Sequence, residues 1–343
     1  MAETLLEVKD LKVQFATEDG VVKAVDGVSF KLERGKVLGI VGESGSGKSV
    51  TAMTLMGLTG GVNSRFEGEI IYKGTDLLKL SDDQMQAYRG AELGMIFQDP
   101  MTSLNPVYRI GDQIAEAIRV HEKVDKRGAK NRSVELLRAV GIPNPEARVD
   151  DFPHQFSGGM RQRAMIAMAL SCNPDLLIAE EPTTALDVTI QAQIIELIAR
   201  LKDDFNSAVI MITHDLGVVA DIADEIIVMY AGQVVEQAET RDLFYDSQHP
   251  YTWGLLGSIP RLDRPRPDRL HSIKGAPPSL INVPQGCAFR PRCPHAFSRC
   301  MERPGLDNRV DDVPTHLDRC WLDVPYKRSH REETISGGHT EAA

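Results

Sequence analysis

The chain has 343 residues, and 39 Lys and Arg against 49 Asp and Glu give it a net charge of −10. At roughly 100–200 residues per domain, this length predicts two domains, or one large domain with an appendage. The acidic balance argues against charge-driven binding to nucleic acid. The longest apolar run, residues 164–170, is far shorter than the ~20 residues that a membrane span needs. The N-terminus lacks the pattern of a secretion signal, so we expect a soluble, intracellular protein.

In chain order, short apolar runs between turn residues predict strands at residues 37–41 and 69–72. Residues 98–170 are mostly helical in pattern, with amphipathic segments at 110–120 and 133–140. Residues 171–245 return to buried strands separated by helices. These elements are strands at 176–179, 208–213 and 225–230 and a helix near 190–202. The alternation is typical of a mostly parallel sheet covered on both faces.

The composition of the sequence changes beyond about residue 246, where prolines preclude long regular elements. They are Pro260, Pro265, Pro267, Pro277, Pro278 and Pro284. We expect an extended linker there that leads into a cluster of cysteines. The polar residues 327–343 predict a frayed, disordered tail.

One segment fits the P-loop pattern and reads Gly42-Glu43-Ser44-Gly45-Ser46-Gly47-Lys48-Ser49. It follows the predicted strand at 37–41 and precedes a helix-like run, which is the context that the motif requires. Its glycines let successive backbone N–H groups turn toward phosphate oxygens. Lys48 would reach the β- and γ-phosphates, and the Ser49 hydroxyl would ligate Mg²⁺. The segment therefore predicts a nucleotide site.

Further motifs follow in a fixed order. They are Gln98, Phe156-Ser157-Gly158-Gly159-Met160-Arg161-Gln162-Arg163, Leu176-Leu177-Ile178-Ala179-Glu180-Glu181-Pro182, Thr184-Ala185-Leu186-Asp187 and His214. With the P-loop, they resemble the ATP-binding subunits of ABC transporters over roughly residues 1–245. More narrowly, the chain resembles the subunits that power dipeptide and oligopeptide importers, a group that includes nickel importers. The narrower cues are residues 97–106, His249-Pro250-Tyr251-Thr252 and the terminal cysteines.

The resemblance implies an α/β fold. It would be a P-loop ATPase core (residues 1–97 and 171–245) with an N-terminal antiparallel β subdomain, and an inserted α-helical subdomain (98–170) that carries the signature motif. A Pro/Cys-rich C-terminal extension (246–326) would follow.

The signature motif also has a reason in its residues. Ser157, Gly158 and Gly159 open a predicted helix and offer a hydroxyl, two unhindered amides and a helix N-terminus. Because the chain already has one phosphate cradle, a second anion-binding terminus is best explained if it serves a nucleotide on a partner chain. The resemblance implies two such subunits, head to tail, with two ATP molecules between them.

Several polar residues are candidates for catalysis. Glu181 lies just past a predicted strand, where a carboxylate could orient and polarise the attacking water. His214 ends the strand at 208–213 and could bond the γ-phosphate, and Gln98 could contact Mg²⁺ and water. Asp187 would face the partner chain. Phe15 is a candidate for stacking on adenine, although it could equally be a core residue of a strand.

One residue departs from the family pattern. The residue before the catalytic glutamate is normally Asp, which holds Mg²⁺ through water, but here it is Glu180. Coordination of Mg²⁺ is geometrically strict, so we expect weaker metal affinity or slower turnover, with ATP binding kept. Met160 stands where Gln is common, which puts little in doubt.

Between Gln98 and Ser157 lie 58 residues, enough for a compact helical subdomain. The resemblance implies that this insert receives a coupling helix of a permease. The expected partners are two transmembrane permease subunits, a second, homologous ATPase subunit and, through the complex, an external substrate-binding protein. The expected location is the cytoplasmic face of the cell membrane, with peripheral attachment.

Four of the five cysteines share a 34-residue stretch: Cys287, Cys293, Cys300 and Cys320. In a reducing cytosol such a cluster more often indicates a metal than disulfides. The spacing lacks the tight CxxC pairs of common zinc ribbons, and four thiolates suit either zinc or an iron–sulfur cluster. The resemblance to peptide-importer subunits favours [4Fe–4S], with zinc and no metal left as alternatives.

The leading hypothesis is an ATPase that powers peptide uptake, with ATP and Mg²⁺ as cofactors. One alternative is a soluble ABC ATPase acting on nucleic acid or ribosomes, which the charge and the short insert argue against. Another is a regulatory subunit that binds ATP without hydrolysing it. Glu181 and His214 argue against this second alternative, while Glu180 keeps it open.

Overall fold

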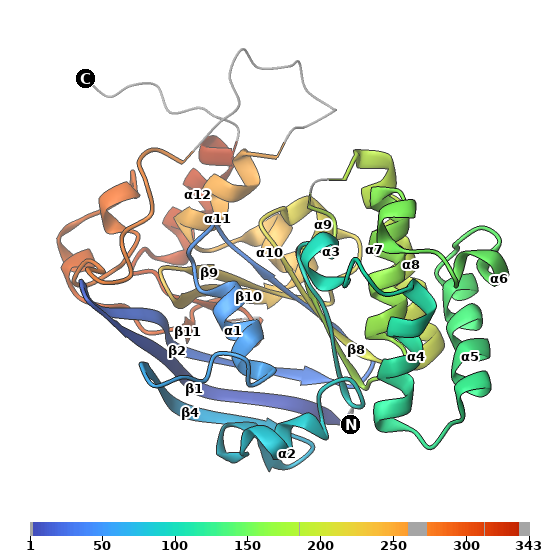
Figure 1. Cartoon of the computed structure of the whole chain (residues 1–343). Helices are drawn as coiled ribbons and strands as arrows, with labels where there is room; N and C mark the ends of the chain where they lie inside the picture. Colours follow the sequence, from blue (N-terminus) through green and yellow to red (C-terminus); the bar gives the residue numbers. More distant parts are fainter. Residues whose placement is uncertain (1–2, 185, 260–272, 312, 336–343) are drawn as a thin grey trace.

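The computed structural model describes residues 3–184, 186–259, 273–311 and 313–335. An antiparallel sheet of four strands in the order β2-β1-β4-β5 lies along one side of the molecule (Figure 1). Its strands are β1 (Thr4–Thr17), β2 (Gly20–Glu33), β4 (Ser64–Tyr72) and β5 (Thr75–Asp76). This is the antiparallel part that the family resemblance implied. Of this sheet, only part of β4 was predicted from the sequence. Strands β1 and β2 were not predicted, because register shifts in their long hairpin interrupt the strict alternation of apolar and polar residues.

The second sheet has eight strands in the order β11-β12-β10-β9-β3-β8-β7-β6. Five of them run parallel: β3 (Val37–Val41), β6 (Leu93–Ile96), β7 (Leu176–Glu180), β8 (Ala208–Thr213) and β9 (Glu225–Tyr230). Almost every residue of these five is buried, as expected for strands covered on both faces. Their carboxyl ends meet at one edge, and the phosphate loop, Gln98, Glu181 and His214 follow directly there. The predicted α/β fold is therefore confirmed.

Alternate residues of the parallel strands build two cores. On one face, Leu38 and Ile40 of β3 pack with α1 (Lys48–Leu55) and the antiparallel sheet. On the other face, Val37 and Val41 pack with α8 (Val188–Phe205) and the helices of the insert. The remaining helices beside the core are α2 (Asp82–Gln86), α9 (Leu216–Ala220) and α10 (Thr240–Asp246).

The insert is helical, as predicted, and is coloured teal to green in Figure 1, where most of its helices lie together at the right of the view. Its helices are α3 (Pro100–Ser103), α4 (Ile110–His121), α5 (Lys126–Ala139), α6 (Pro145–Arg148) and α7 (Gly158–Ala169). The apolar side of α4, with Ile110, Ile114 and Ile118 buried, faces α5 and α7. Short 3₁₀ turns occur at Leu77–Lys79, Pro153–Gln155, Arg290–Arg292 and Ser298–Met301.

Two expectations about the C-terminal part are wrong. The chain after residue 246 does not continue as a linker, because Pro250 opens α11 (Pro250–Gly257), whose Trp253 is fully buried. The tail expected from residue 327 is helical up to Ile335, since α12 (Val324–Ile335) packs on α11. Buried polar side chains hold it there, including Lys327, whose Nζ lies 2.7 Å from Asp318 Oδ1. Residues 336–343 of the expected tail and residues 260–272 of the expected linker lie outside the described residues.

The extension also continues the core sheet. Strand β10 (Gln233–Glu239) runs antiparallel to β9 and pairs with β12 (Leu317–Asp318), which pairs with β11 (Asp307–Asn308). Strands β11 and β12 could not be predicted because two residues give no periodicity, and the seven-residue β10 was also not predicted. Within the described segments, no helix is both long enough and apolar enough to cross a bilayer.

Candidate active site

The backbone of the phosphate loop (residues 42–49) requires its glycines. Gly42 and Gly47 adopt φ angles of 151° and 102°. A Cβ at Gly42 would lie 2.2 Å from the Met229 carbonyl oxygen, and one at Gly47 would lie 2.4 Å from the Ala24 carbonyl oxygen. Any side chain at either position would therefore push the loop away from the sheet edge.

The side chain of Lys48, near the end of the phosphate loop, reaches back to the start of the loop. Its Nζ donates hydrogen bonds to the carbonyl oxygens of Gly42 (2.6 Å) and Glu43 (2.9 Å). Burial lowers the pKa of Lys48, although the carboxylates of Glu181 and Glu180 act in the opposite direction. The ammonium is thus held at the loop, next to two acidic groups, by carbonyls that a phosphate could replace.

The rest of the loop leaves room for a ligand. Ser44, Gly45 and Ser49 are exposed, and a Cβ added at Gly45 would meet no atom within 4 Å. The loop therefore has an open side at Ser44, Gly45 and Ser49, while the Lys48 ammonium lies buried against the loop carbonyls. The N–H groups, ammonium and hydroxyl of the loop fit the phosphates of a nucleotide and its Mg²⁺.

Three side chains from separate segments converge on Glu181. Its Oε2 accepts hydrogen bonds from Gln98 Nε2 (3.0 Å) and Thr184 Oγ1 (2.8 Å). Its Oε1 lies 3.2 Å from His214 Nδ1. Glu181 has a φ of 42°, a left-handed backbone conformation that is uncommon for a residue with a side chain and that recurs at functional sites.

These contacts keep the Glu181 carboxylate ionised. Burial alone would raise its pKa, but the bonds from Thr184 and His214, together with the charges of His214 and Lys48, lower it overall. An ionised, oriented carboxylate at the mouth of a phosphate cradle can polarise a water molecule for attack on phosphorus. Thr184 was given no individual role in the sequence analysis, because a hydroxyl in a turn gives no signal by itself.

Glu180 ends β7 and is buried, with only 4% of its surface exposed. It is close enough to Lys48 to affect the pKa of the ammonium. The structure thus puts the residue that departs from the family pattern next to the phosphate loop, where the sequence analysis expected a ligand of Mg²⁺.

The signature residues occupy a different part of the surface. Ser157 is the N-cap of α7, and its Oγ accepts a hydrogen bond from the Met160 N–H (3.3 Å). Ser157 and Gly158 are exposed, and a Cβ on Gly158 would contact nothing. Among the described residues, no hydrogen bond joins this segment to the phosphate loop of the same chain. Gly159 packs against Ile190 near the start of α8.

Asp187 and Phe15 each have a structural role in the single chain. Asp187 is the exposed N-cap of α8, where its Oδ1 accepts from the Ile190 N–H (3.0 Å). Phe15 is half-buried on the core and pairs in register with Val22. Val22 lines a cavity together with Ser44, Gly45 and residues 277–281, so Phe15 lies next to a space that adjoins the phosphate loop.

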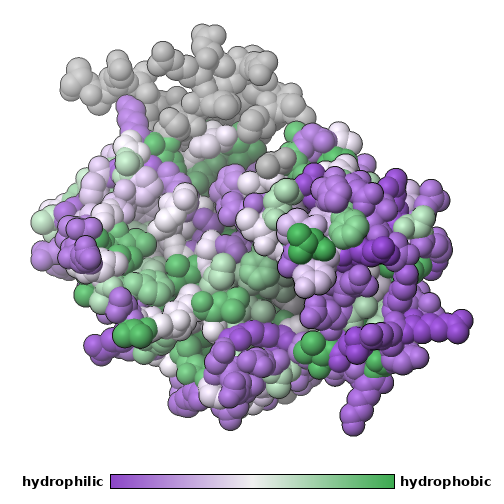
Figure 2. Space-filling model, viewed as in Figure 1, coloured by the Kyte–Doolittle hydropathy of each residue, from purple (hydrophilic) through white to green (hydrophobic). Residues whose placement is uncertain are grey.

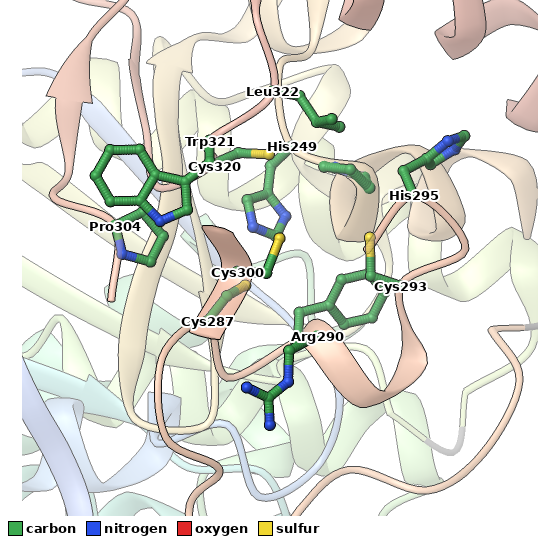
Figure 3. Close-up of a pocket in the computed structure, with 12 residues that line it drawn as sticks. His249, Cys287, Arg290, Cys293, His295, Cys300, Pro304, Cys320, Trp321 and Leu322 are labelled. Carbon is green, nitrogen blue, oxygen red and sulfur yellow. The ribbon is translucent and has the colours of Figure 1, made fainter. Parts of the chain in front are cut away.

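The four clustered cysteines meet at a pocket in the extension. Cys287, Cys293, Cys300 and Cys320 all line it, together with His249 (Figure 3). The Cys287 N–H donates to the Cys300 carbonyl oxygen (3.0 Å), which brings two of the cysteines together across a turn. Burial raises the pKa of Cys287, Cys293 and Cys320, that of Cys320 to about 12.

The positions of these thiols do not form a ready site for one ion. In the described segments, no group of three or more His, Cys, Asp or Glu side chains is arranged so that it could hold a metal ion. All four are free thiols. The predicted convergence of the cysteines is thus found at the level of a shared pocket, while the predicted metal remains without support from the geometry.

Comparisons with known proteins agree with this geometry. A match to the ABC transporter family spans residues 25–184, and a match to the C-terminal region of oligopeptide/dipeptide transporters spans residues 235–300. The oligopeptide transport ATP-binding protein OppD of Bacillus subtilis (strain 168) is 55% identical over 319 residues, 93% of this chain and 88% of that protein. The chain belongs to the oligopeptide and dipeptide transport ATP-binding proteins. As a member of this ABC transporter family, it is an ATPase.

Other relatives extend the comparison. The dipeptide transport protein DppD of Lactococcus lactis subsp. cremoris (strain MG1363) is 53% identical over 93% of this chain and 91% of that protein. Among solved structures, the dimeric post-hydrolysis state of the ATP-binding cassette MJ0796 bound to ADP and Pi superposes with a TM-score of 0.62 at 25% identity. That comparison covers 69% of this chain and 99% of the cassette.

Proposed function

We propose that this chain is the ATP-hydrolysing subunit of an importer that takes up dipeptides or oligopeptides through separate permease subunits. The observation that carries the proposal is the similarity to OppD and DppD, which runs through both the ATPase core and the cysteine-bearing extension. Neither relative gives support to a role on nucleic acid or ribosomes. The hydrogen bonds around Glu181 favour hydrolysis over mere binding of ATP.

In this proposal the phosphate loop holds ATP. Lys48 leaves the carbonyls of Gly42 and Glu43 for the β- and γ-phosphates, and the loop N–H groups bond the same oxygens. Ser49, Gln98 and Glu180 would hold Mg²⁺, which when bound neutralises charge on the phosphates. Phe15 would stack on the base from beside the cavity at Val22.

Hydrolysis would depend on the residues that converge on Glu181. The ionised carboxylate accepts a hydrogen bond from the attacking water and draws off its proton, while Gln98 and Thr184 fix the direction of the carboxylate. His214 is 60% exposed and could turn a donor toward the γ-phosphate. These roles are proposals for named side chains in a geometry that suits them.

The second half of the site would come from a partner ATPase subunit. Ser157 and Gly158 are exposed at the start of α7, and the solved cassette MJ0796, which resembles this chain, is a dimer. We propose head-to-tail pairing, in which these residues close over the ATP of a homologous but different chain and Asp187 faces the partner.

The permease would dock on the insert. Met101 in α3 and Val107 and Tyr108 beyond it are 59%, 73% and 58% exposed. Figure 2 shows hydrophobic residues gathered with polar ones over the region where Figure 1 draws α3. Such a patch, linked through Gln98 to Glu181, suits a contact that reports the state of ATP to a membrane partner. The chain would then lie on the cytoplasmic face of the membrane, and an external binding protein would deliver the peptide.

The cysteine pocket would hold a [4Fe–4S] cluster. The proposal rests on the all-sulfur donor set and on the match of residues 235–300 to the C-terminal region of oligopeptide/dipeptide transporters. It requires the thiols to move into a coordination geometry that the described segments do not form. Four thiolates would bind the irons, and the cluster would tie together a segment with little core of its own. Iron and sulfide analysis of anaerobically purified protein tests this part, and an iron-free preparation that lacks visible absorbance would refute it.

The experiment that tests the proposed function is reconstitution. The chain is assembled in vesicles with its permeases and second ATPase, and ATP hydrolysis is measured with and without the peptide-loaded binding protein. We expect peptide to stimulate hydrolysis and to accumulate in the vesicle interior that corresponds to the cytoplasm. Hydrolysis that is insensitive to every peptide tested, with no accumulation, would refute the assignment.

A further inference from the structure

A residue of the cysteine-bearing extension binds the phosphate loop. It is Arg292, which lies 249 positions after its partner Glu43 in the chain. Arg292 donates two hydrogen bonds to the Glu43 carboxylate, from Nη1 to Oε2 (2.6 Å) and from Nη2 to Oε1 (3.0 Å). Glu43 is the second residue of the loop. This paired geometry fixes both the position and the plane of the carboxylate.

The Arg292 side chain is enclosed, with only 5% of its surface exposed. Its guanidinium lies over the rings of Tyr230 and Phe289, 5.8 and 6.0 Å from their centroids. Its Nε donates to the Lys274 carbonyl oxygen (3.0 Å). The Glu43 side chain is 28% exposed, so the ion pair is enclosed on the arginine side and only partly shielded on the carboxylate side. A multiply bonded, partly buried pair of this kind costs more to disturb than a pair fully in solvent.

A second contact reaches the backbone of the same loop residue. The Glu43 N–H donates to the hydroxyl of Tyr251, which belongs to α11 (2.8 Å). The Glu43 carbonyl accepts from Lys48, the residue that must move when phosphate arrives. Glu43 is therefore fixed through its side chain and its N–H by the C-terminal part of the chain, and linked through its carbonyl to the phosphate-binding lysine.

Arg292 is also the residue before Cys293. It ends the 3₁₀ turn Arg290–Arg292, and Cys293 continues the turn through its N–H bond to the Arg290 carbonyl oxygen (3.3 Å). The same short turn therefore positions both the Cys293 side of the cysteine pocket and the Arg292 guanidinium.

From these contacts we infer that Arg292 is a positioning residue for ATP binding. It holds the phosphate loop in its binding geometry through Glu43, so that the folded state of the cysteine-bearing extension sets the affinity for ATP. This inference goes beyond the proposed function, which gives Arg292 no role in nucleotide binding. Small displacements of a preorganised site carry large costs, so the loss of this ion pair weakens binding even though Arg292 never touches ATP.

The test is a double-mutant cycle on the full-length chain. Arg292→Ala, Glu43→Ala and the double variant are titrated with a fluorescent ATP analogue, and iron content is measured in parallel. We expect each single variant to bind about tenfold more weakly than the unmodified chain, and the double variant to be no worse than either. Arg292→Lys keeps the charge without the paired geometry and should recover part of the affinity.

Kinetics of the assembled transporter separate positioning from loss of structure. The KM for ATP should rise while kcat changes little, because Glu181, Gln98 and His214 are untouched; a variant that merely unfolds lowers kcat. Arg328→Ala is the matched control, since it removes a two-nitrogen ion pair of α12 with Asp246 that does not involve the phosphate loop. The affinity of the Arg328→Ala variant for ATP should stay within about twofold of that of the unmodified chain.

Each outcome decides the matter. Unchanged affinity in Arg292→Ala, or additive losses in the double variant, would overturn the inference and leave the proposed function intact. If Arg292→Ala loses iron or does not fold, Glu43→Ala and Glu43→Gln decide from the loop side, and normal ATP affinity in both would overturn it. An unmodified chain that binds no ATP would instead refute the proposed function.

Discussion

The phosphate loop and the cysteine pocket are built in different ways. Eight consecutive residues make the loop, and its shape follows from backbone conformations at Gly42 and Gly47 that only glycine permits without a clash. The pocket instead collects side chains from three turns and from the start of α11. The loop takes its shape from its own backbone, with one long-range support from Arg292 through Glu43. The pocket depends throughout on the packing of distant segments around it.

This difference predicts how the two regions respond to change. Removing a single chemical group near the loop should alter one step of the ATP cycle and leave the fold unchanged. Removing a group in the pocket should instead alter stability and metal content together.

The largest effect should come from Glu181→Gln. Because the carboxylate is the proposed acceptor for the proton of the attacking water, we expect kcat of the assembled transporter to fall by about 10²–10⁴-fold. The affinity for ATP should stay within about threefold, since Lys48 and the loop N–H groups are unchanged. Phosphate release and binding of a fluorescent ATP analogue measure the two quantities, and a loss below about tenfold in kcat would remove Glu181 from the catalytic role.

Cys300→Ser tests the pocket, with Cys172→Ser as a matched control. Cys300 is buried in the pocket, whereas Cys172 is half-buried beside Ala117, away from it. If the proposed cluster is present, we expect iron per chain to fall more than about tenfold in Cys300→Ser and to stay unchanged in Cys172→Ser, because only the first removes a proposed ligand. Equal iron in both anaerobic preparations would contradict the cluster and the contrast drawn from it.

Glu180→Asp sharpens the account of the loop region. The shorter side chain restores the reach that is usual in the family, so the Mg²⁺ concentration for half-maximal hydrolysis should fall about threefold. Titration of Mg²⁺ at saturating ATP measures it. An unchanged titration curve and rate would mean that the additional methylene of Glu180 is accommodated without cost.

His316→Asn should give the smallest effect, on stability. Burial lowers the pKa of His316, but the Glu236 carboxylate, 2.8 Å away, outweighs it and raises the pKa above 6.5. A raised folded-state pKa adds stability that is complete below pH 6.5 and is lost as the pH rises through the folded value. The melting temperature should therefore drop by about 2 °C more at pH 6 than at pH 8.5. Equal drops at both pH values would contradict a charged His316.

The features that could be predicted from the sequence are the phosphate loop and the residues at the ends of the apolar strands. Four of the five parallel strands are continuous apolar runs and were predicted, whereas β6, which contains Gly94, was not. Glu181 and His214 follow the carboxyl ends of two predicted strands, so their place at one edge of the sheet could be expected. The links across the chain could not. Nothing local pairs Arg292 with Glu43, and the polar sequence around Lys327 conceals a helix held by a buried ion pair with Asp318. Such contacts appear only once the fold brings distant segments together.

The central claim is that ATP is hydrolysed between two subunits, with Lys48 on one and Ser157 on the other. Light scattering of the Glu181→Gln chain with its homologous partner subunit tests it most directly, in ATP and in ADP. The account predicts a stable pair in ATP alone, abolished by Ser157→Arg. A chain that stays monomeric in ATP while the unmodified protein hydrolyses at full rate would contradict it.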